Sequence, residues 1–106
     1  MQYLLLICVD PSLQPDEPAG EIEAWLDRVG ERRLAGGPLQ PARTATTARV
    51  RRSERLLTDG PFAETKEIVA GFDLIECDSR EEALEIAATH PVAKFGAVEV
   101  RELIPD

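Results

Sequence analysis

The chain has 106 residues, the size of one domain, and 20 Asp and Glu against 12 Lys and Arg give it a formal net charge of −8. Hydrophobic residues make up 43% and charged residues 30%, a globular composition that excludes wholesale disorder. The acidic balance argues against nucleic acid as the main partner, because phosphate binding needs a cationic surface. We therefore predict a single domain over residues 1–106 with no nucleic-acid partner.

The first predicted element is a strand over residues 3–9, which is apolar at both parities and so indicates cover on both faces. This run is far shorter than the roughly 20 residues that span a bilayer. It also lacks the basic flank and cleavage site of a signal peptide. We therefore predict a cytoplasmic protein with no membrane partner.

The two cysteines, Cys8 and Cys77, both lie in apolar strand-like stretches. Neither belongs to a C-x-x-C or metal-binding spacing, so we predict no metal site and no cofactor. The favoured interpretation is two buried thiols that behave as small hydrophobic side chains. A redox pair on neighbouring strands is the alternative.

A helix is predicted after the loop at residues 14–18, with Asp16 or Glu17 near its N-cap and Pro18 in its first turn. Its buried stripe follows the i, i+3, i+4, i+7 spacing and consists of Ile22, Trp25, Leu26 and Val29. Arg32 and Arg33 suit the negative end of this helix, and residues 36–38 (Gly-Gly-Pro) end the segment.

The middle of the chain is rich in β-branched residues and predicts strands over 44–51 and 55–58, joined by a polar hairpin connection at 52–54. The only basic cluster lies here and consists of Arg49, Arg51, Arg52 and Arg55. Exposed charges that oppose edge aggregation explain it best, although contact with an acidic partner is an alternative. A turn at residues 59–62 then leads to an apolar strand over 68–75, in which Gly71 marks a bulge or a close backbone approach.

A second helix over residues 81–89 is predicted by the capping box of Ser79 and Glu82, with Asp78 as an alternative cap. Its buried face is expected to hold Leu84, Ala87 and Ala88. His90-Pro91 ends the helix, because proline disfavours helical geometry in the residue before it. Residues 97–101 then form a final alternating strand.

The predicted order, β-α-β-β-β-α-β, favours an α+β fold: a ferredoxin-like sandwich with an antiparallel-dominated sheet and two helices on one face. We expect the strands at residues 3–9 and 68–75 to be central and parallel. The other face of the sheet would be apolar and bare, and large exposed apolar patches mark interaction sites. We therefore predict a homodimer whose sheets pack face to face.

Residues 59–67, Asp-Gly-Pro-Phe-Ala-Glu-Thr-Lys-Glu, resemble the signature of the DGPF-motif branch of the YCII-related proteins. The ending at residues 96–101 and the opening Met-x-Tyr-x-Leu-Leu-Ile fit the same family. The resemblance implies a dimeric ferredoxin-like α+β barrel. Members of the wider family include small enzymes, such as a dehydrochlorinase of a chlorinated hydroxyhydroquinone, that use a His and an Asp in a cleft. The DGPF branch is often encoded beside extracytoplasmic-function sigma factors.

Three residues are the catalytic candidates. His90 is the single histidine, and it is either a general acid or base or a helix-end cation favoured by the helix dipole. Asp59 orients His90, takes a proton itself if burial raises its pKa, or is a turn residue whose carboxylate accepts backbone N–H bonds. Asp73, a weaker candidate, interrupts an apolar strand, so its carboxylate must reach solvent or meet a cation.

The binding candidates belong to the same signature and are Gly60, Pro61, Phe62, Glu64 and Lys66. Phe62 is expected to be a pocket wall or, more simply, part of the core. The charged members form a solvated face, or Lys66 anchors an anion or pairs across the dimer.

With the resemblance to YCII-type enzymes, these residues imply general acid–base, elimination-type chemistry on a small acidic or phenolic molecule, in a cleft near the 59–62 loop. One alternative is a non-catalytic ligand-binding or regulatory dimer associated with sigma-factor signalling. The other is a structural dimer in which the signature only shapes a hairpin corner.

Overall fold

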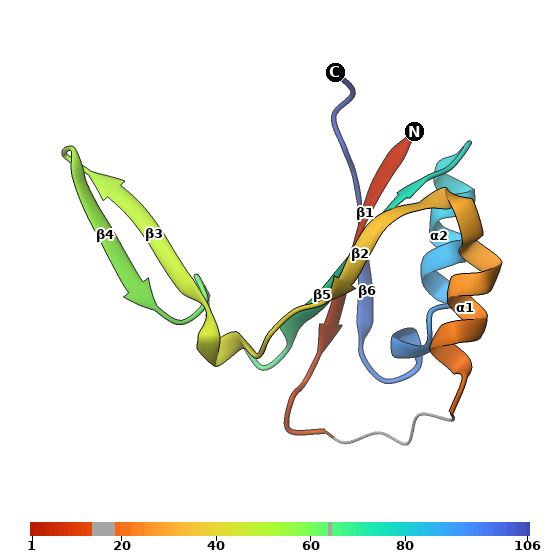
Figure 1. Ribbon diagram of the computed structural model, residues 1–106, viewed down its shortest axis with the longest axis horizontal. Helices are drawn as coiled ribbons and strands as arrows, with labels where there is room; N and C mark the ends of the chain where they lie inside the picture. The colour runs from red at the N-terminus through yellow and green to blue at the C-terminus, as the bar shows by residue number, and fades with distance from the viewer. Residues whose placement is uncertain (14–18, 64) are drawn as a thin grey trace.

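The computed structural model describes residues 1–13, 19–63 and 65–106. Four strands form an antiparallel sheet in the order β2-β5-β1-β6, namely β1 (Gln2–Val9), β2 (Arg33–Pro38), β5 (Ile68–Glu76) and β6 (Ala97–Glu102). The helices α1 (Glu21–Val29) and α2 (Arg80–Ala88) both cover one face of this sheet, as Figure 1 shows. The strands β3 (Thr46–Arg51) and β4 (Glu54–Asp59) form a separate two-stranded sheet. Short 3₁₀ turns complete the fold: η1 (Gly30–Arg32), η2 (Ala42–Thr44) and η3 (Pro91–Lys94).

This arrangement confirms the predicted ferredoxin-like sandwich, with one correction of strand direction. The central strands are β1 and β5, as expected, but they pair antiparallel rather than parallel. The strands β1 and β2, which helix α1 connects, run parallel to each other without pairing. The strand β5 lies between them and pairs antiparallel with both. The prediction of parallel pairing was therefore wrong.

The edge strand β2 was missed, because its residues were assigned to the end of the first helix. Helix α1 begins at Glu21 behind Gly20, so the predicted caps Asp16 and Glu17 lie outside the described residues. The helix ends at Val29, and Arg33 already belongs to β2. A segment containing Gly-Gly-Pro has low strand propensity, and here its pairing with β5 decides its structure. The predicted hairpin exists as β3 and β4, but outside the main sheet.

The core lies between the sheet and the helices. Tyr3, Leu5, Trp25 and Ile75 are its largest fully buried side chains. The predicted stripe of α1 is confirmed at Trp25 and Val29, which are buried, and at Leu26, which packs against the core. Ile22, at the start of the stripe, is partly exposed.

Helix α2 buries a different face from the predicted one. Ala83, Ile86 and Ala87 are buried, whereas Leu84 is 42% exposed and Ala88 is exposed. The spacing of 83, 86 and 87 is also i, i+3, i+4, so the helical period alone permits either face. The predicted placement of Leu84 and Ala88 was therefore wrong, and that of Ala87 is confirmed.

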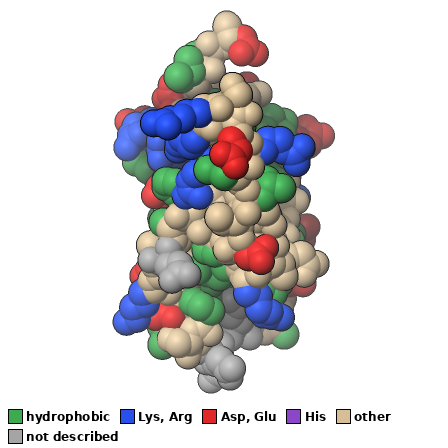
Figure 2. All heavy atoms as spheres, turned by 90° about the vertical axis from the view of Figure 1, so that its left-hand side faces the viewer, with side chains coloured by type: hydrophobic (Ala, Val, Ile, Leu, Met, Phe, Trp, Pro, Cys, Tyr) green, Lys and Arg blue, Asp and Glu red, His purple; other side chains and the backbone are tan. Residues whose placement is uncertain are grey.

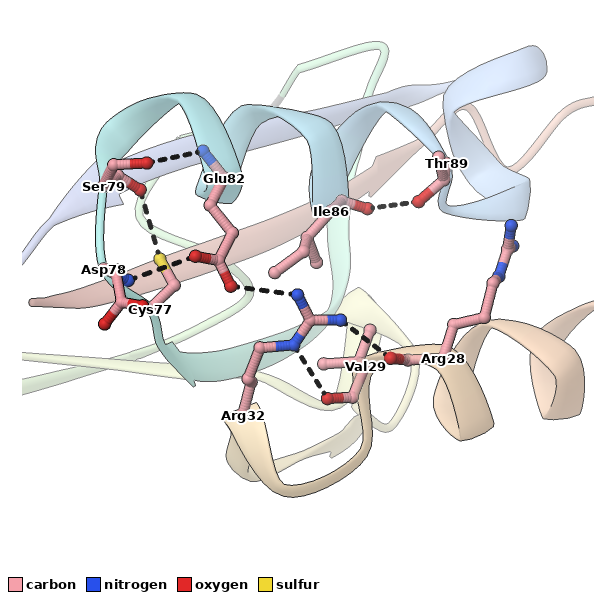
Figure 3. A network of polar contacts seen from close by, with 9 residues as sticks. All are labelled: Arg28, Val29, Arg32, Cys77, Asp78, Ser79, Glu82, Ile86 and Thr89. Carbon is pink, nitrogen blue, oxygen red and sulfur yellow. Dashed lines mark hydrogen bonds and ion pairs between the residues drawn. The ribbon is translucent and has the colours of Figure 1, made fainter.

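The predicted N-cap of α2 is present at Ser79, and Glu82 ties the two helices together (Figure 3). Ser79 Oγ accepts a hydrogen bond from the backbone N–H of Glu82 at 3.1 Å. The Glu82 carboxylate accepts from the backbone N–H of Asp78 and from Arg32 Nη1 at 2.9 Å. Arg32 also donates to the carbonyls of Arg28 and Val29 at the end of α1, as expected of a basic residue there. Hydrogen bonding to Arg32 is the main cause that lowers the pKa of Glu82.

The two cysteines are far apart in the sheet. Cys8 pairs with Val69 near the end of β1, whereas the backbone N–H of Cys77 donates to the carbonyl of Met1 at the opposite end. Both thiols are free, and burial raises the pKa of each. Cys77 is buried, as predicted, whereas Cys8 is only half-buried. The redox pair is excluded by their separation.

The face of the sheet opposite the helices carries apolar side chains. Strand alternation places Leu4, Leu6, Phe72 and Leu74 on this face, and the register pairs Leu4 with Leu74 and Leu6 with Phe72. All four are half-buried. We refer to this surface as the open sheet face; the homodimer inferred from it stays a prediction. Within the described residues no helix is long and apolar enough to cross a membrane.

Candidate functional site

A cavity of about 270 Å³ lies between α1 and the β2–β5 edge of the sheet. Its apolar walls come mainly from Ile7, Ile22, Trp25 and Leu26. Arg33, Asp73 and His90 supply its charged and polar lining. An apolar cavity of roughly 150 Å³ can hold a benzene ring, so this one has room for a small substituted ring. A mainly apolar pocket with a few convergent polar groups is the usual form of a small-molecule site.

Asp73 is held in this cavity by an ion pair. Its side chain is 8% exposed, and its Oδ1 atom accepts a hydrogen bond from Arg33 Nε at 2.6 Å. Of the two fates predicted for this carboxylate, solvent or a cation, the structure shows the cation. Because Arg33 lies on β2 and Asp73 on β5, the pair also joins the edge strand to the sheet.

Gly36 makes room for this ion pair. A Cβ atom at Gly36 would lie 2.4 Å from Asp73 Oδ1, 2.6 Å from the carbonyl oxygen of Phe72 and 2.9 Å from Arg33 Nη2. These distances are closer than real Cβ contacts, so a side chain at this position is incompatible with the observed pair. The Gly-Gly sequence predicted to stop a helix therefore allows a buried carboxylate to approach the edge strand. At Gly71 the predicted close approach is confirmed, because a Cβ there would lie 3.0 Å from the carbonyl oxygen of Gly37.

His90 is buried at the same cavity, with 5% of its surface exposed. Its Nδ1 atom accepts a hydrogen bond from the backbone N–H of Val92 at 3.0 Å, so it caps η3. The proton of the neutral ring therefore lies on Nε2. Burial lowers the pKa of His90, and the nearby charge of Asp73 opposes this shift in part. The ring is thus a neutral hydrogen-bond donor at neutral pH, which corrects the alternative of a helix-end cation.

Trp25 orients the imidazole. The two rings meet edge to face, with centroids 4.5 Å apart and an interplanar angle of 66°. The indole Nε1 donates to the carbonyl of Ile86 at 2.9 Å, which fixes the ring against α2. A backbone carbonyl of α2 thus holds the indole ring, and a backbone N–H of η3 holds the imidazole ring. This wall of the cavity is therefore preorganised.

Asp59 lies elsewhere in the chain. It is the last residue of β4, exposed, and pairs with Thr46 of β3. It is not among the residues that line the cavity of His90. Within one chain the structure therefore brings Asp73, and not Asp59, together with His90. A catalytic role for Asp59 stays a prediction.

The other signature residues surround the base of the β3–β4 hairpin. Phe62 is 80% exposed, with the Arg49 guanidinium 5.5 Å from its ring centroid, so its expected place in the core was wrong. Pro61 lines a second hollow between this loop and residues 39–45, and Gly60 donates its N–H to the carbonyl of Ala45. A binding role for Gly60, Pro61 and Phe62 stays a prediction. Glu64 lies outside the described residues.

Lys66 contacts the end of β1. Its Nζ atom lies 3.8 Å from Asp10 Oδ2, and its side chain is largely exposed. The other carboxylate oxygen of Asp10 accepts two hydrogen bonds from Ser12, the main cause that lowers the pKa of Asp10. Lys66 thus contacts a carboxylate of its own chain, and its anion-binding role stays a prediction.

Sequence reasoning missed Arg33 and Trp25 as site residues. Arg33 was assigned to the helix end, and its partner Asp73 lies 40 positions away, so no local pattern links them. A usable signal was present, however: an acidic residue inside an apolar strand requires a buried cation or another polar partner. Among the described residues, no group of three or more His, Cys, Asp or Glu is arranged to hold a metal ion.

Comparison with known proteins agrees with this fold. The family model described as the YCII-related domain matches residues 1–105. The chain belongs to the YCII-related family. A relative in Rhizobium meliloti (strain 1021), an uncharacterised protein, is 45% identical over 67 residues, which cover 61% of this chain. The chain spans about half of that relative, 54% of its length.

A solved structure is similar to nearly the whole chain. It is the 5-chloro-2-hydroxyhydroquinone dehydrochlorinase from Burkholderia phenoliruptrix AC1100 in complex with 2,5-dihydroxybenzoquinone. The similarity covers 98% of this chain and 94% of that one, with a TM-score of 0.52 and 17% sequence identity. At this identity the likeness establishes the shared fold.

Proposed function

We propose that the cavity between α1 and the β2–β5 edge binds a small hydroxylated ring and that Asp73 removes a proton from it. The observation that carries this proposal is the position of the two buried polar residues of the described chain, Asp73 and His90, which both line this one cavity. Buried polar groups that converge in a mainly apolar pocket are typical of small-molecule and catalytic sites.

The geometry supports a division of labour between these residues. Asp73 Oδ1 is occupied by Arg33, which leaves Oδ2 as the oxygen available to accept a proton. His90 Nδ1 is occupied by the N–H of Val92, which leaves Nε2–H as a donor to a ligand oxygen. A base on one side and a donor for a developing oxyanion on the other is the arrangement that enolisation requires.

An elimination follows from these roles without any external oxidant or reductant. The ring first takes its keto form, in which the proton of one ring hydroxyl has moved to the carbon that bears the leaving group. Asp73 then removes the proton of a second ring hydroxyl, and the electrons of that O–H bond form a carbonyl while a ring double bond shifts to the carbon that bears the leaving group. The bond to the leaving group breaks, the leaving group departs as an anion with its electron pair, and the ring becomes a quinone. The related dehydrochlorinase structure makes a chlorinated hydroxyhydroquinone a reasonable first substrate to test.

The test compares Asp73→Asn with the parent protein. Chloride release from 5-chloro-2-hydroxyhydroquinone is measured by ion chromatography, and binding of 2,5-dihydroxybenzoquinone by calorimetry. Loss of a general base is worth about 10²- to 10⁴-fold, so Asp73→Asn should lower chloride release by at least about 100-fold while the quinone still binds. Asp27→Asn, an exposed position on α1, is the matched control and should match the parent. Equal release by the parent and Asp73→Asn would contradict the proposal.

A second function is favoured by one observation: Asp73 and His90 each already accept a hydrogen bond from their own chain. Groups satisfied in this way suit a ligand-binding or regulatory module that performs no chemistry. In that case the quinone binds to the parent protein, no chloride is released, and Asp73→Asn changes affinity alone. The Asp59→Asn variant, measured in parallel, tests the role predicted for the signature.

A further inference from the structure

The cation of the cavity, Arg33, has a different setting from the arginines of the β3–β4 hairpin. Figure 2, which views the molecule from the side of this hairpin, shows Lys and Arg side chains on the outer surface. Arg51, Arg52 and Arg55 of the hairpin are exposed. The Arg33 side chain is 28% exposed, and among the described residues that line the cavity it alone carries a positive charge. Burial of a guanidinium is unfavourable unless its donors find partners, so the contacts of Arg33 decide what this cavity accepts.

The ion pair with Asp73 uses only one edge of this guanidinium. Arg33 Nε donates to Asp73 Oδ1, and within the described part of the chain neither Nη atom donates to a protein group. Among the described residues, the buried side-chain nitrogen or oxygen that has no partner is Asp10 Oδ2, so the two Nη atoms are not sealed inside the protein. They carry four of the five N–H groups of the side chain. Four donors of a residue that lines the cavity are therefore available to a ligand.

Donors outnumber acceptors among the side chains that line the cavity. To the four N–H groups of Arg33, His90 adds its Nε2–H, because the Nδ1 atom of this residue is occupied. Of the described lining side chains, the one with a free acceptor is Asp73, through its Oδ2 atom. Trp25 Nε1–H is already used, because it donates to the carbonyl of Ile86. A matching ligand must therefore offer several acceptor oxygens, and a carboxylate offers two such oxygens and no donor.

We propose that Arg33 binds a carboxylate group on the ring, so that the ligand of this cavity is a hydroxylated aromatic acid; the proposed ring-binding function is the premise. The end of a guanidinium presents two parallel N–H groups that match the two oxygens of a carboxylate. Arg33 is the more exposed member of its ion pair, at 28% against 8% for Asp73, which places the carboxylate toward the mouth of the cavity. The ring hydroxyls then lie deeper, beside Asp73 Oδ2 and His90 Nε2. A charged group at the more exposed end costs less desolvation.

The neighbouring charge of Asp73 is compatible with a bound carboxylate. Asp73 is paired at the Nε edge of Arg33, whereas the ligand uses the Nη end of the same guanidinium. The chain as a whole carries a formal charge of −8, so its overall field does not attract an anion. The preference for an acid therefore depends on one local contact, and a change at Arg33 should remove it.

A phosphate ester of the ring is the other anion that a guanidinium can bind. Phosphate groups in proteins are commonly held by a helix N-terminus or by a cluster of arginines. The described lining of this cavity holds one cation beside one carboxylate, which suits a singly charged group better than a doubly charged one. The carboxylate is therefore the favoured group.

The experiment compares two ligands of nearly the same shape, 2,5-dihydroxybenzoate and the neutral 2,5-dihydroxybenzamide. Calorimetry measures both affinities. Trp25 is the single tryptophan and lines the cavity, so a shift of its indole N–H resonance in proton NMR locates the ligand there. A hydrogen bond to a charged group contributes about 10- to 100-fold in affinity, so the parent protein should bind the acid at least about 10-fold more tightly than the amide.

The variants change the ratio of these two affinities, which a general loss of structure would not do. Arg33→Gln should bring the ratio close to one, and Arg33→Lys, which keeps a cation beside Asp73 but loses the planar fork, should reduce it. Arg43→Gln removes the same charge from an exposed position in η2 that does not line the cavity, and it should keep the ratio of the parent. Asp73→Asn removes the proposed base but keeps Arg33, so it should retain or increase the ratio. Far-UV circular dichroism establishes that each variant is folded.

The outcomes separate this assignment from the function on which it rests. A parent protein that binds the acid and the amide equally would overturn the carboxylate assignment and leave the proposed role of Asp73 standing. A folded Arg33→Gln variant with the full preference of the parent would overturn it as well, and so would tighter binding of 2,5-dihydroxyphenyl phosphate than of 2,5-dihydroxybenzoate. A parent protein that binds none of these rings would contradict the ring-binding function itself.

Discussion

The four-stranded sheet with its two helices, here called the body, and the β3–β4 hairpin at residues 46–59, here called the arm, are stabilised in different ways. In the body, Tyr3 and Trp25 are completely buried, and hydrogen bonds and ion pairs such as Trp25 to Ile86 and Arg33 to Asp73 join separate elements. In the arm, cross-strand pairing is the main internal interaction, and every residue of β4 is exposed. The run at residues 59–67 that resembles a family signature begins at the end of the arm, whereas the cavity is built from residues without any motif. The segment that is easiest to recognise in the sequence therefore begins in the arm, whereas the tightly packed residues lie in the body.

The largest expected effect is on the body. Trp25→Ala removes a fully buried side chain, its edge-to-face contact with His90 and its hydrogen bond to Ile86. It should lower the free energy of unfolding by about 4 kcal/mol, measured by urea denaturation. Leu56→Ala, on the arm's Phe62 side, should cost less than about 1 kcal/mol. Equal losses in the two variants would show that the arm is as tightly packed as the body.

A smaller effect is expected at the two adjacent glycines of β2. Gly36→Ala forces a Cβ atom against Asp73 Oδ1 and the backbone of Phe72 and should cost about 2 kcal/mol. Gly37→Ala meets nothing within 4 Å, so it should change stability by about 0.5 kcal/mol or less. Thermal denaturation compares the two variants. If Gly37→Ala is the more damaging one, the close packing of Asp73 does not depend on Gly36.

The smallest effect is a pH dependence in the body that the arm lacks. Burial lowers the pKa of His90 below the 6.5 of an unfolded chain. Between these two values the unfolded chain binds the proton and the folded one does not, so stability falls as pH decreases from 6.5 through the folded pKa. His90→Asn keeps an acceptor for the Val92 N–H and should flatten this dependence.

Urea denaturation between about pH 5.5 and 7.5 measures this dependence, and proton NMR of the single histidine gives its pKa directly. A folded pKa above 6.5 in the parent protein would contradict the buried, neutral imidazole. Glu85→Gln, an exposed change on α2, is the matched control and should retain the slope of the parent.

Much of the fold could be predicted because its elements are encoded locally. The strands β1, β5 and β6 and the capping box of α2 each have their own composition or spacing. Strand β2 could not be predicted in this way, because Gly-Gly-Pro is stabilised as a strand only by its partner β5. Likewise, Leu84 and Ile86 are equally apolar in the sequence, and only tertiary packing decides which is buried.

The candidate site could be predicted only at residues that stand out in the sequence by themselves. His90 and Asp73 stand out as a single histidine and as a carboxylate within an apolar strand. Arg33 and Trp25 do not, because their roles depend on contacts with residues 40 and 65 positions away. The signature drew attention to Asp59, whose structural setting is the arm rather than the cavity.

The close approach at Gly36 has an evolutionary consequence. Because a side chain at position 36 and the Asp73 carboxylate would occupy the same space, the two positions cannot change independently in this backbone. A lineage that gains an acid at 73 must already have glycine at 36, and an acid lost there removes the constraint. In an alignment of relatives, glycine at 36 should therefore accompany aspartate at 73, and the order of the two substitutions in a phylogeny should always be glycine first.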